Sequence, residues 1–168
     1  ADKATDTLEL IYATVGEGTR RLSQMKPGDT SDMTAPCGRP WRLNASSKKS
    51  VLVAGGVGIT PIIAAARKLT ELGVEFDAVI GAQTAEKLFG EEDLLALRAQ
   101  NVYVTTDDGS KGIKGFVTAA LEEPLCQGVW DAVYTCGPEP MMRSVAKLAI
   151  AHNVACQVSM ERMMSCAF

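Results

Sequence analysis

The residues best suited to chemistry form a glycine-rich turn in the first half of the chain. An apolar run leads into Gly55-Gly56-Val57-Gly58-Ile59-Thr60-Pro61, and a segment of helical period follows. Glycines let the backbone turn tightly and approach a ligand, and the free N–H groups of a helix start favour an anion such as a pyrophosphate. Thr60 suits the N-cap and Pro61 the first helical position. The spacing is not G-x-G-x-x-G, so the glycines could also serve only a tight strand-to-helix turn.

Three other stretches follow apolar runs in the same way. They are Gly81-Ala82-Gln83-Thr84, Thr105-Thr106-Asp107-Asp108-Gly109-Ser110 and Cys136-Gly137-Pro138-Glu139-Pro140-Met141-Met142. In the first, no Arg or Lys comes before Lys87, which favours NAD over NADP because a 2′-phosphate is typically met by an Arg; Gln83 could equally be a solvated loop residue. The second could contact a ribose or nicotinamide, hold a metal, act as an acid–base pair or be an ordinary turn.

The third stretch combines a cysteine with a flexible backbone. Gly137 allows the close approach of a flat ligand. Cys136 could touch a nicotinamide ring, or it could be a small buried hydrophobe. His152 is the only histidine, near the end of a predicted helix, and we assign it no catalytic role.

Alternating strands and helices must position these stretches. Short apolar runs predict strands at Val51–Ala54, Phe76–Ala82, Val102–Thr105, Ala132–Cys136 and Ala155–Ser159. Segments of helical period lie at Thr60–Leu72, Glu91–Gln100, Val117–Glu122 and Glu139–His152. This order predicts an α/β fold with a doubly wound, parallel, five-stranded sheet. Ligands of such sheets bind outside the carboxyl ends of the strands, where all four stretches fall.

The first 44 residues differ in sequence pattern from the rest of the chain. Alternating residues over Leu8–Thr14 predict a strand, and breaks follow at Gly16–Thr19 and Lys26–Asp29. So few strands cannot close a barrel, so we expect residues 1–44 to be the C-terminal part of a larger β-domain. The polar residues 45–50 predict a linker, and residues 51–159 the nucleotide-binding domain.

Composition excludes several classes of function. The chain has 168 residues, 46% hydrophobic and 22% charged, with a net charge of -3 and no basic patch, so we expect no nucleic-acid partner. No apolar run reaches the roughly 20 residues of a membrane-spanning helix, and we expect a soluble cytoplasmic protein. The five cysteines are scattered, which argues against a disulfide framework.

The ordered series of motifs resembles the ferredoxin reductase superfamily, and most closely the electron-transfer subunits of class 1B dihydroorotate dehydrogenases. Any one motif is weak evidence for this family, but the ordered series of motifs along the chain is specific. The pieces are Leu10-Ile11-Tyr12, Gly16–Thr19, Leu22 with Lys26–Asp29, Gly55–Pro61, Thr105–Ser110, Lys114–Thr118, Cys136-Gly137-Pro138 with Met141, and Cys156–Met163.

The resemblance implies cofactors and residues that contact them. Residues 1–44 would be the C-terminal part of an FAD-binding β-barrel, with FAD contacts from Ile11, Tyr12, Ala13, Gly18 and Thr19. The NAD contacts implied are Gly55, Gly56, Gly58, Thr60 and Pro61 at the pyrophosphate, Asp107 and Asp108 in the cleft, and Cys136, Gly137 and Met141 by the nicotinamide. Residues 160–168 would begin a [2Fe–2S]-binding tail with Cys166 as its first ligand. The other three ligands would lie beyond residue 168, so we expect no cluster in this chain.

The resemblance also implies a function. The intact subunit would pass electrons between NADH, FAD and the cluster, to or from a flavin-containing catalytic subunit of dihydroorotate dehydrogenase in pyrimidine biosynthesis. It would therefore be part of a hetero-oligomer, and no side chain need act as an acid or base.

Three alternatives remain open. The chain could belong to an NADPH-dependent ferredoxin oxidoreductase or sulfide dehydrogenase. It could come from a self-sufficient reductase of the oxygenase type. It could also be a non-catalytic module that senses or binds a nucleotide without transferring electrons.

Overall fold

The computed structural model describes residues 7–33 and 38–160. The chain divides into two compact units between Arg39 and Pro40. We call them the N-terminal unit and the C-terminal unit, and each is described by itself. None of the helices in the described ranges has the length and hydrophobicity needed to span a bilayer.

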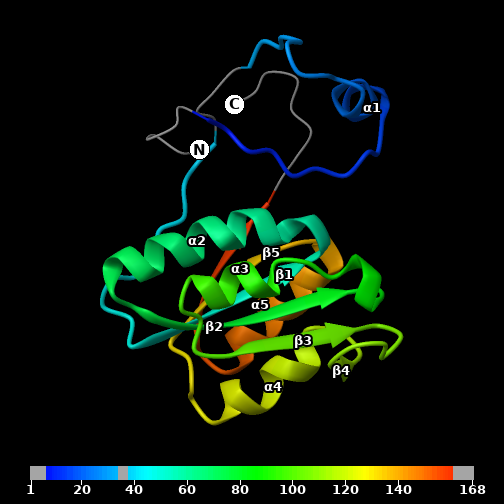
Figure 1. Cartoon of the computed structure of the whole chain (residues 1–168). Coiled ribbons are helices and arrows are strands. Elements are labelled where there is room, and N and C mark those ends of the chain that lie inside the picture. The colour runs from blue at the N-terminus through cyan, green and yellow to red at the C-terminus, as the bar shows by residue number, and fades with distance from the viewer. Residues whose placement is uncertain (1–6, 34–37, 161–168) are drawn as a thin grey trace. The chain divides into compact units, whose positions relative to one another are not determined.

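The C-terminal unit is built on a sheet of six parallel strands in the order β4-β3-β2-β1-β5-β6 (Figure 1). The strands are β1 (Lys49–Gly55), β2 (Glu75–Ala82), β3 (Val102–Thr106), β4 (Ile113–Lys114), β5 (Ala132–Cys136) and β6 (Ala155–Ser159). The predicted parallel α/β sheet is confirmed, but its predicted count of five strands is wrong. The missed strand, β4, pairs through only two residues with Thr105 and Thr106, too few to show an apolar run or a period.

Helices cover both faces of this sheet. They are α2 (Ile59–Leu72), α3 (Glu91–Ala96), α4 (Thr118–Cys126) and α5 (Glu139–Ala151), with short 3₁₀ turns at η1 (Gly56–Gly58) and η2 (Ala85–Lys87). Figure 1 shows α2 and α4 on opposite sides of the sheet. The core is divided accordingly, because Leu52 and Ala54 of β1 pack in the cluster that includes α2 and α3, whereas Val51 and Val53 pack with α4 and α5. Burial on both faces explains why β1 reads as a continuous apolar run.

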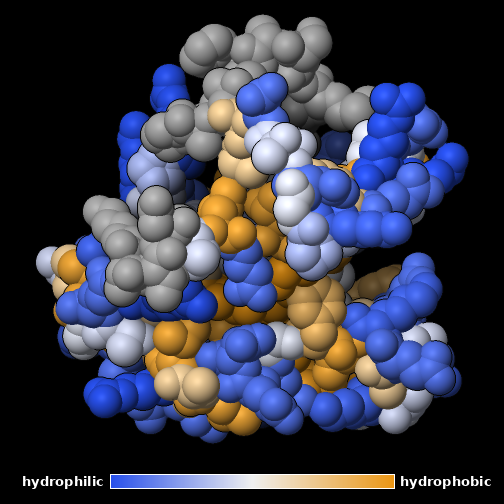
Figure 2. Space-filling model, turned by 45° about the horizontal axis from the view of Figure 1, so that its top comes forward, coloured by the Kyte–Doolittle hydropathy of each residue, from blue (hydrophilic) through white to orange (hydrophobic). Residues whose placement is uncertain are grey.

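Hydrophobic side chains also remain at the surface of the molecule, as the space-filling view shows (Figure 2). In the C-terminal unit the exposed apolar residues include Phe116 at 72% and Ile150 at 73%. Ile150 lies in the last turn of α5, which leads to the amino end of β6, whereas Phe116 lies shortly before α4, at the carboxyl ends where the sheet is expected to bind its ligand. Only Phe116 of these two is therefore a candidate for the site.

All four helices of the C-terminal unit have boundaries that differ from those predicted, α5 only in ending at Ala151. Helix α2 begins at Ile59, with Gly58 at the N-cap, so Thr60 is not the N-cap. Helix α3 ends at Ala96, because the chain turns into the left-handed region at Arg98 (φ 67°). Helix α4 continues to Cys126 and contains Pro124 in its last turn. Local turn chemistry at each end, rather than the apolar period, decides these boundaries.

The residues before β1 are tied to the C-terminal unit. The Trp41 indole N–H donates to the Pro61 carbonyl in the first turn of α2 (2.9 Å). Its ring packs edge-on against Tyr134 of β5, with centroids 5.9 Å apart, and the Tyr134 hydroxyl accepts the Asn44 N–H (2.9 Å). Strand β1 then starts at Lys49, inside the segment expected to be a linker.

A buried carboxylate lies at the amino end of β2. Asp77 is fully buried and accepts hydrogen bonds from Trp130 Nε1 (2.7 Å) and Asn101 Nδ2 (3.0 Å). The ammonium of Lys49 lies 2.7 Å from the same carboxylate. A buried charge with three partners is compensated, so this cluster holds the starts of β1 and β2 together.

The N-terminal unit holds α1 (Glu17–Ser23) and irregular segments. The strand predicted over Leu8–Thr14 is absent from the described structure, which has only a bridge residue at Thr7. Leu8 and Leu10 are each 50% exposed, so no buried sheet face holds this run in a strand. The predicted break at Gly16–Thr19 is instead the start of α1, where the Thr19 hydroxyl accepts the Gly16 N–H (3.1 Å).

Candidate functional site: a pocket at the carboxyl ends of the strands

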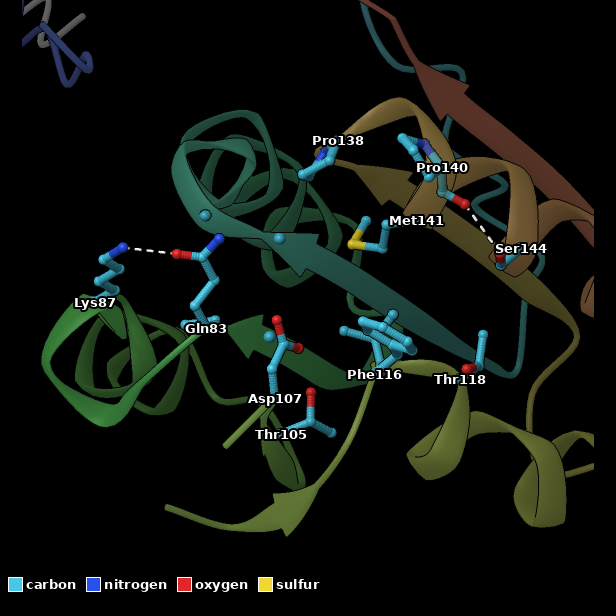
Figure 3. A pocket seen from close by; sticks show the side chains of 15 residues that line it. Gln83, Lys87, Thr105, Asp107, Phe116, Thr118, Pro138, Pro140, Met141 and Ser144 are labelled. Carbon is cyan, nitrogen blue, oxygen red and sulfur yellow. Dashed lines mark hydrogen bonds between the residues drawn. The ribbon is translucent and has the colours of Figure 1, made fainter. Parts of the chain in front are cut away.

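A pocket of about 480 Å³ lies in the C-terminal unit where the central strands end (Figure 3). Its walls come from the turns after β1, β2, β3 and β5 and from the segment before α4. The lining residues are Gly55, Gly56, Gly81, Ala82, Gln83, Lys87, Thr105, Asp107, Phe116, Val117, Thr118, Pro138, Pro140, Met141 and Ser144. This is the edge at which a parallel α/β sheet binds ligands.

The glycines of the turn after β1 have different physical roles. A Cβ on Gly58 would lie 2.6 Å from the Cys136 carbonyl carbon and 2.7 Å from the Gly137 Cα, so only glycine lets the two turns pack. A Cβ on Gly55 would likewise lie 2.5 Å from Met141 Sδ. Gly56 differs, because its φ is +54° and nothing lies within 4 Å of its missing Cβ. Gly56 is therefore the position where the turn presents open backbone to the pocket.

Only some of the residues predicted to contact a ligand around this turn line the pocket. Thr60 and Pro61 do not line it, and the Thr60 hydroxyl donates back to the Val57 carbonyl (3.1 Å). Cys136 is 5% exposed, among the hydrophobic core residues. Met141 lines the pocket from the first turn of α5, as Figure 3 shows.

The two adjacent carboxylates after β3 are separated by the fold. Asp107 lines the pocket. Asp108 does not, and its carboxylate accepts hydrogen bonds from the Ser110 hydroxyl (2.6 Å) and the Ser110 N–H (3.0 Å). The side-chain hydrogen bond is the main cause that lowers the pKa of Asp108, and the backbone hydrogen bond adds to it. Asp107 thus faces the pocket, whereas Asp108 orders its own turn.

Several lining residues were not expected from the sequence. Lys87 and Gln83 reach the pocket together, with Lys87 Nζ donating to Gln83 Oε1 (2.6 Å; Figure 3). The sequence argument for NAD, which rested on the lack of a base near the end of β2, is weakened because Lys87 lines this site. Phe116 is 72% exposed beside the pocket. Its signal was present in the sequence as a single large apolar residue between a glycine and a helix start.

The pocket wall also contains a hydroxyl without a hydrogen-bond partner. Thr105 is 1% exposed, and its Oγ1 has no partner within the part of the chain that the structure describes. Val117 covers the neighbouring Gly81, since a Cβ there would lie 2.5 Å from Val117 Cγ1 and 3.1 Å from Thr105 Oγ1. An unpaired buried hydroxyl is costly, which marks Thr105 as a group with spare hydrogen-bonding capacity at the site.

The residues expected to contact FAD lie in the N-terminal unit. Ile11 and Tyr12 are 42% and 37% exposed, and Ala13 is also exposed. Gly18 lines a shallow hollow of about 410 Å³ that also includes Arg21 and Asp29. Cys166, the expected cluster ligand, lies outside the described residues. Among residues 7–33 and 38–160, no three His, Cys, Asp or Glu side chains gather as a metal site would require.

The fold and pocket define an NAD-binding domain of an oxidoreductase. The chain belongs to the oxidoreductase NAD-binding domain family, whose model matches residues 52–147. More particularly, it is a homologue of the electron transfer subunits of dihydroorotate dehydrogenase B. It is 40% identical to the probable subunit from Methanopyrus kandleri over 94% of this chain and 59% of that protein, and 38% identical to the subunit from Bacillus caldolyticus over 94% and 60%.

Solved structures agree with this assignment of fold. An NADH-dependent reduced ferredoxin-NADP oxidoreductase matches with a TM-score of 0.80 and 32% identity, over 91% of this chain and 55% of that one. The cytochrome b5 reductase domain of Ulva prolifera nitrate reductase shares the fold at a TM-score of 0.63 and 21% identity, over 86% of this chain and 64% of that one. The chain thus spans about three fifths of the length of the curated relatives named above.

Proposed function

We propose that this chain is the NADH-binding part of an electron-transfer flavoprotein subunit that serves the catalytic subunit of a dihydroorotate dehydrogenase. The observation that carries the proposal is the open glycine turn at Gly56, which faces a pocket of about 480 Å³ in a chain 36–40% identical to several such subunits. A non-catalytic module could share the pocket, but the similarity to electron transfer subunits extends over more than nine tenths of the chain.

The lining residues suit the parts of a dinucleotide. The N–H groups of the turn around Gly56, next to the start of α2, would donate hydrogen bonds to the pyrophosphate. Asp107 would accept hydrogen bonds from ribose hydroxyls, and its negative charge would oppose a 2′-phosphate, which supports NADH as the preferred cofactor. Phe116 offers an exposed aromatic face on which a flat ring could stack.

The nicotinamide end would lie along Pro138, Pro140 and Met141, which form an apolar wall. NADH supplies a hydride, that is two electrons and one proton, to an acceptor. The chain's own contribution is to hold and orient the ring and to exclude water from this wall; no side chain of the pocket need donate or remove a proton.

FAD and a [2Fe–2S] cluster are proposed only for the complete protein. Of the residues expected to touch FAD, Ile11, Tyr12, Ala13 and Gly18 are exposed and Thr19 is half-buried, so the N-terminal unit as described does not enclose a flavin by itself. Cys166 remains the proposed first ligand of the cluster. The catalytic subunit of dihydroorotate dehydrogenase, with its own flavin, is the proposed partner.

One observation favours a second candidate function. The structure of an NADH-dependent ferredoxin-NADP oxidoreductase is similar to this chain at a TM-score of 0.80. A role in ferredoxin-linked electron transfer uses the same NAD-binding domain with a different partner.

The test uses the full-length protein co-expressed with the neighbouring dehydrogenase subunit. Absorbance spectra are recorded anaerobically before and after NADH, and separately with NADPH. Bleaching of flavin and iron–sulfur bands by NADH, with reduction of orotate to dihydroorotate, supports the proposal. Electron transfer between the protein and ferredoxin, without reduction of orotate, favours the second candidate. A colourless protein that still binds NADH leaves only a binding module.

A further inference from the structure

We propose that Lys87 is the side chain that binds the pyrophosphate of the dinucleotide, held beside the glycine turn by Gln83 and by two anchors of its loop. This inference rests on the proposed function, because it assigns a partner for the ligand's charge within the same pocket. Three observations support the inference: the charge of Lys87, its position and the anchoring of its loop.

The charge of Lys87 is not neutralised by a carboxylate in the described structure. Lys111, on the neighbouring loop, is paired with Glu91 at 2.5 Å. Lys87 is the one basic residue among those lining the pocket, and its hydrogen-bond partner there is the neutral amide of Gln83 (2.6 Å). Figure 3 shows the two side chains reaching toward each other. The ammonium keeps two further N–H donors for a ligand.

Lys87 lies next to the turn that presents open backbone. Together with Gly56 and Ile59 it lines a small second hollow of about 10 Å³, so its side chain lies at the junction of the glycine turn and the start of α2. The N–H groups of such a turn donate hydrogen bonds to phosphate oxygens but carry no net charge. A pyrophosphate is an anion, and a lysine beside it adds the charge-assisted bonds that the turn lacks.

Two anchors fix the loop that carries Lys87. At its far end, a Cβ on Gly90 would lie 2.5 Å from Ile59 Cγ1, so the loop backbone is pressed against the first turn of α2. At its near end, the Ala85 N–H donates to the Ser110 hydroxyl (2.8 Å), which in turn donates to Asp108 (2.6 Å). Lys87, in the 3₁₀ turn Ala85–Lys87, is therefore presented by a loop held on both sides. Asp108 and Ser110 act here as positioning residues.

The test compares ligands that differ in phosphate content. Binding of NADH, ADP-ribose and NADPH to the full-length protein is measured by calorimetry. The affinity for adenosine is measured by its competition with NADH. Lys87→Gln is expected to weaken NADH and ADP-ribose by about 5- to 20-fold and to leave adenosine unchanged, since a hydrogen bond to a charged group contributes more than a neutral one. Lys87→Arg should retain most of the affinity, and salt should weaken wild type more than Lys87→Gln.

Lys147→Gln is the matched control, because Lys147 is exposed on α5 and is not among the pocket's lining residues. It removes the same charge and should change none of these affinities. Equal weakening of adenosine and ADP-ribose by Lys87→Gln, or no weakening at all, would overturn the inference. A loss of NADPH binding far larger than the loss of NADH binding would also overturn it, since Lys87 would then serve the 2′-phosphate. If wild type binds neither NADH nor ADP-ribose, the proposed function itself fails.

Discussion

Three glycine-to-alanine substitutions separate the packing role of the glycine turn from its binding role. Gly56 and Gly73 both have positive φ, +54° and +70°, and at neither would an added methyl group have an atom within 4 Å. Gly73 is the C-cap of α2, outside the pocket lining. Alanine at either should therefore cost about 1–2 kcal/mol of folding free energy from backbone strain alone. Gly58→Ala should cost about 3 kcal/mol, because its methyl would meet the backbone of Cys136 and Gly137, which cannot rotate away.

The two strained variants should differ in binding. A methyl at Gly56 enters the space next to the turn's N–H groups, so we expect Gly56→Ala to weaken NADH binding at least about 10-fold, which is about 1.4 kcal/mol. Gly73→Ala has the same type of strain without that methyl, and it should bind NADH like wild type. Urea unfolding followed by circular dichroism measures the stabilities, and calorimetric titration measures the affinities. At about 2–4 °C per kcal/mol, the thermal midpoints should fall in the same order as the stabilities.

Two results would refute this reasoning. If Gly56→Ala and Gly73→Ala bind NADH equally well, the open turn is not where phosphate approaches. If Gly58→Ala is no less stable than Gly73→Ala, close packing between the turns after β1 and β5 is not what requires glycine there.

Three further predictions concern the carboxylates of Asp107, Asp77 and Asp108. Asp107→Asn should raise the affinity for NADPH relative to NADH about tenfold, because it removes the charge that opposes a 2′-phosphate; an unchanged ratio of dissociation constants would contradict this. Asp77→Asn should lower the free energy of unfolding by about 3 kcal/mol, since the Lys49 ammonium 2.7 Å away loses its counter-charge; a urea titration that shifts by less than about 1 kcal/mol would speak against it. Ser110→Ala should raise the pKa of Asp108 back toward its ordinary value of 3.8 in an NMR titration. Because the folded pKa is lowered, this carboxylate stabilises the fold fully above 3.8, and the contribution is lost as pH falls through the lowered value.

The sequence predicted five strands correctly because each has at least five residues, and the central strands are buried. The five predicted strands each correspond to one in the sheet, and β1 is buried on both faces, which produces an uninterrupted apolar run. β4 was missed because two residues carry no period. The strand predicted at Leu8–Thr14 failed for the opposite reason: its alternation is real, but in the N-terminal unit no buried face accepts it.

The sequence predicted the residues of the site only where they belong to a short local motif. The turn containing Gly56 and the Asp107 position follow directly from stretches at strand ends. Lys87 and Phe116 reach the pocket through the paths of the loops after β2 and before α4. The sequence shows Phe116 as a large apolar residue between a glycine and a helix start, but no local motif gives the path of either loop. The difference between Asp107 and Asp108 is likewise set by the turn that Ser110 closes, which alternation of polar residues does not reveal.

The turns after β1 and β5 are packed closely enough to move together. A Cβ on Gly137 would lie 3.0 Å from the Gly55 nitrogen and 2.8 Å from Met141 Cε, and a Cβ on Gly58 would lie 2.7 Å from the Gly137 Cα. The turn proposed to bind pyrophosphate and the wall proposed to hold nicotinamide are thus in direct contact. Since packed interiors transmit displacement rather than absorb it, a side chain added at Gly137 should shift Gly55 as well as Met141. Substitution at either turn should therefore change the affinity for ADP-ribose, which lacks the nicotinamide, as well as for NADH.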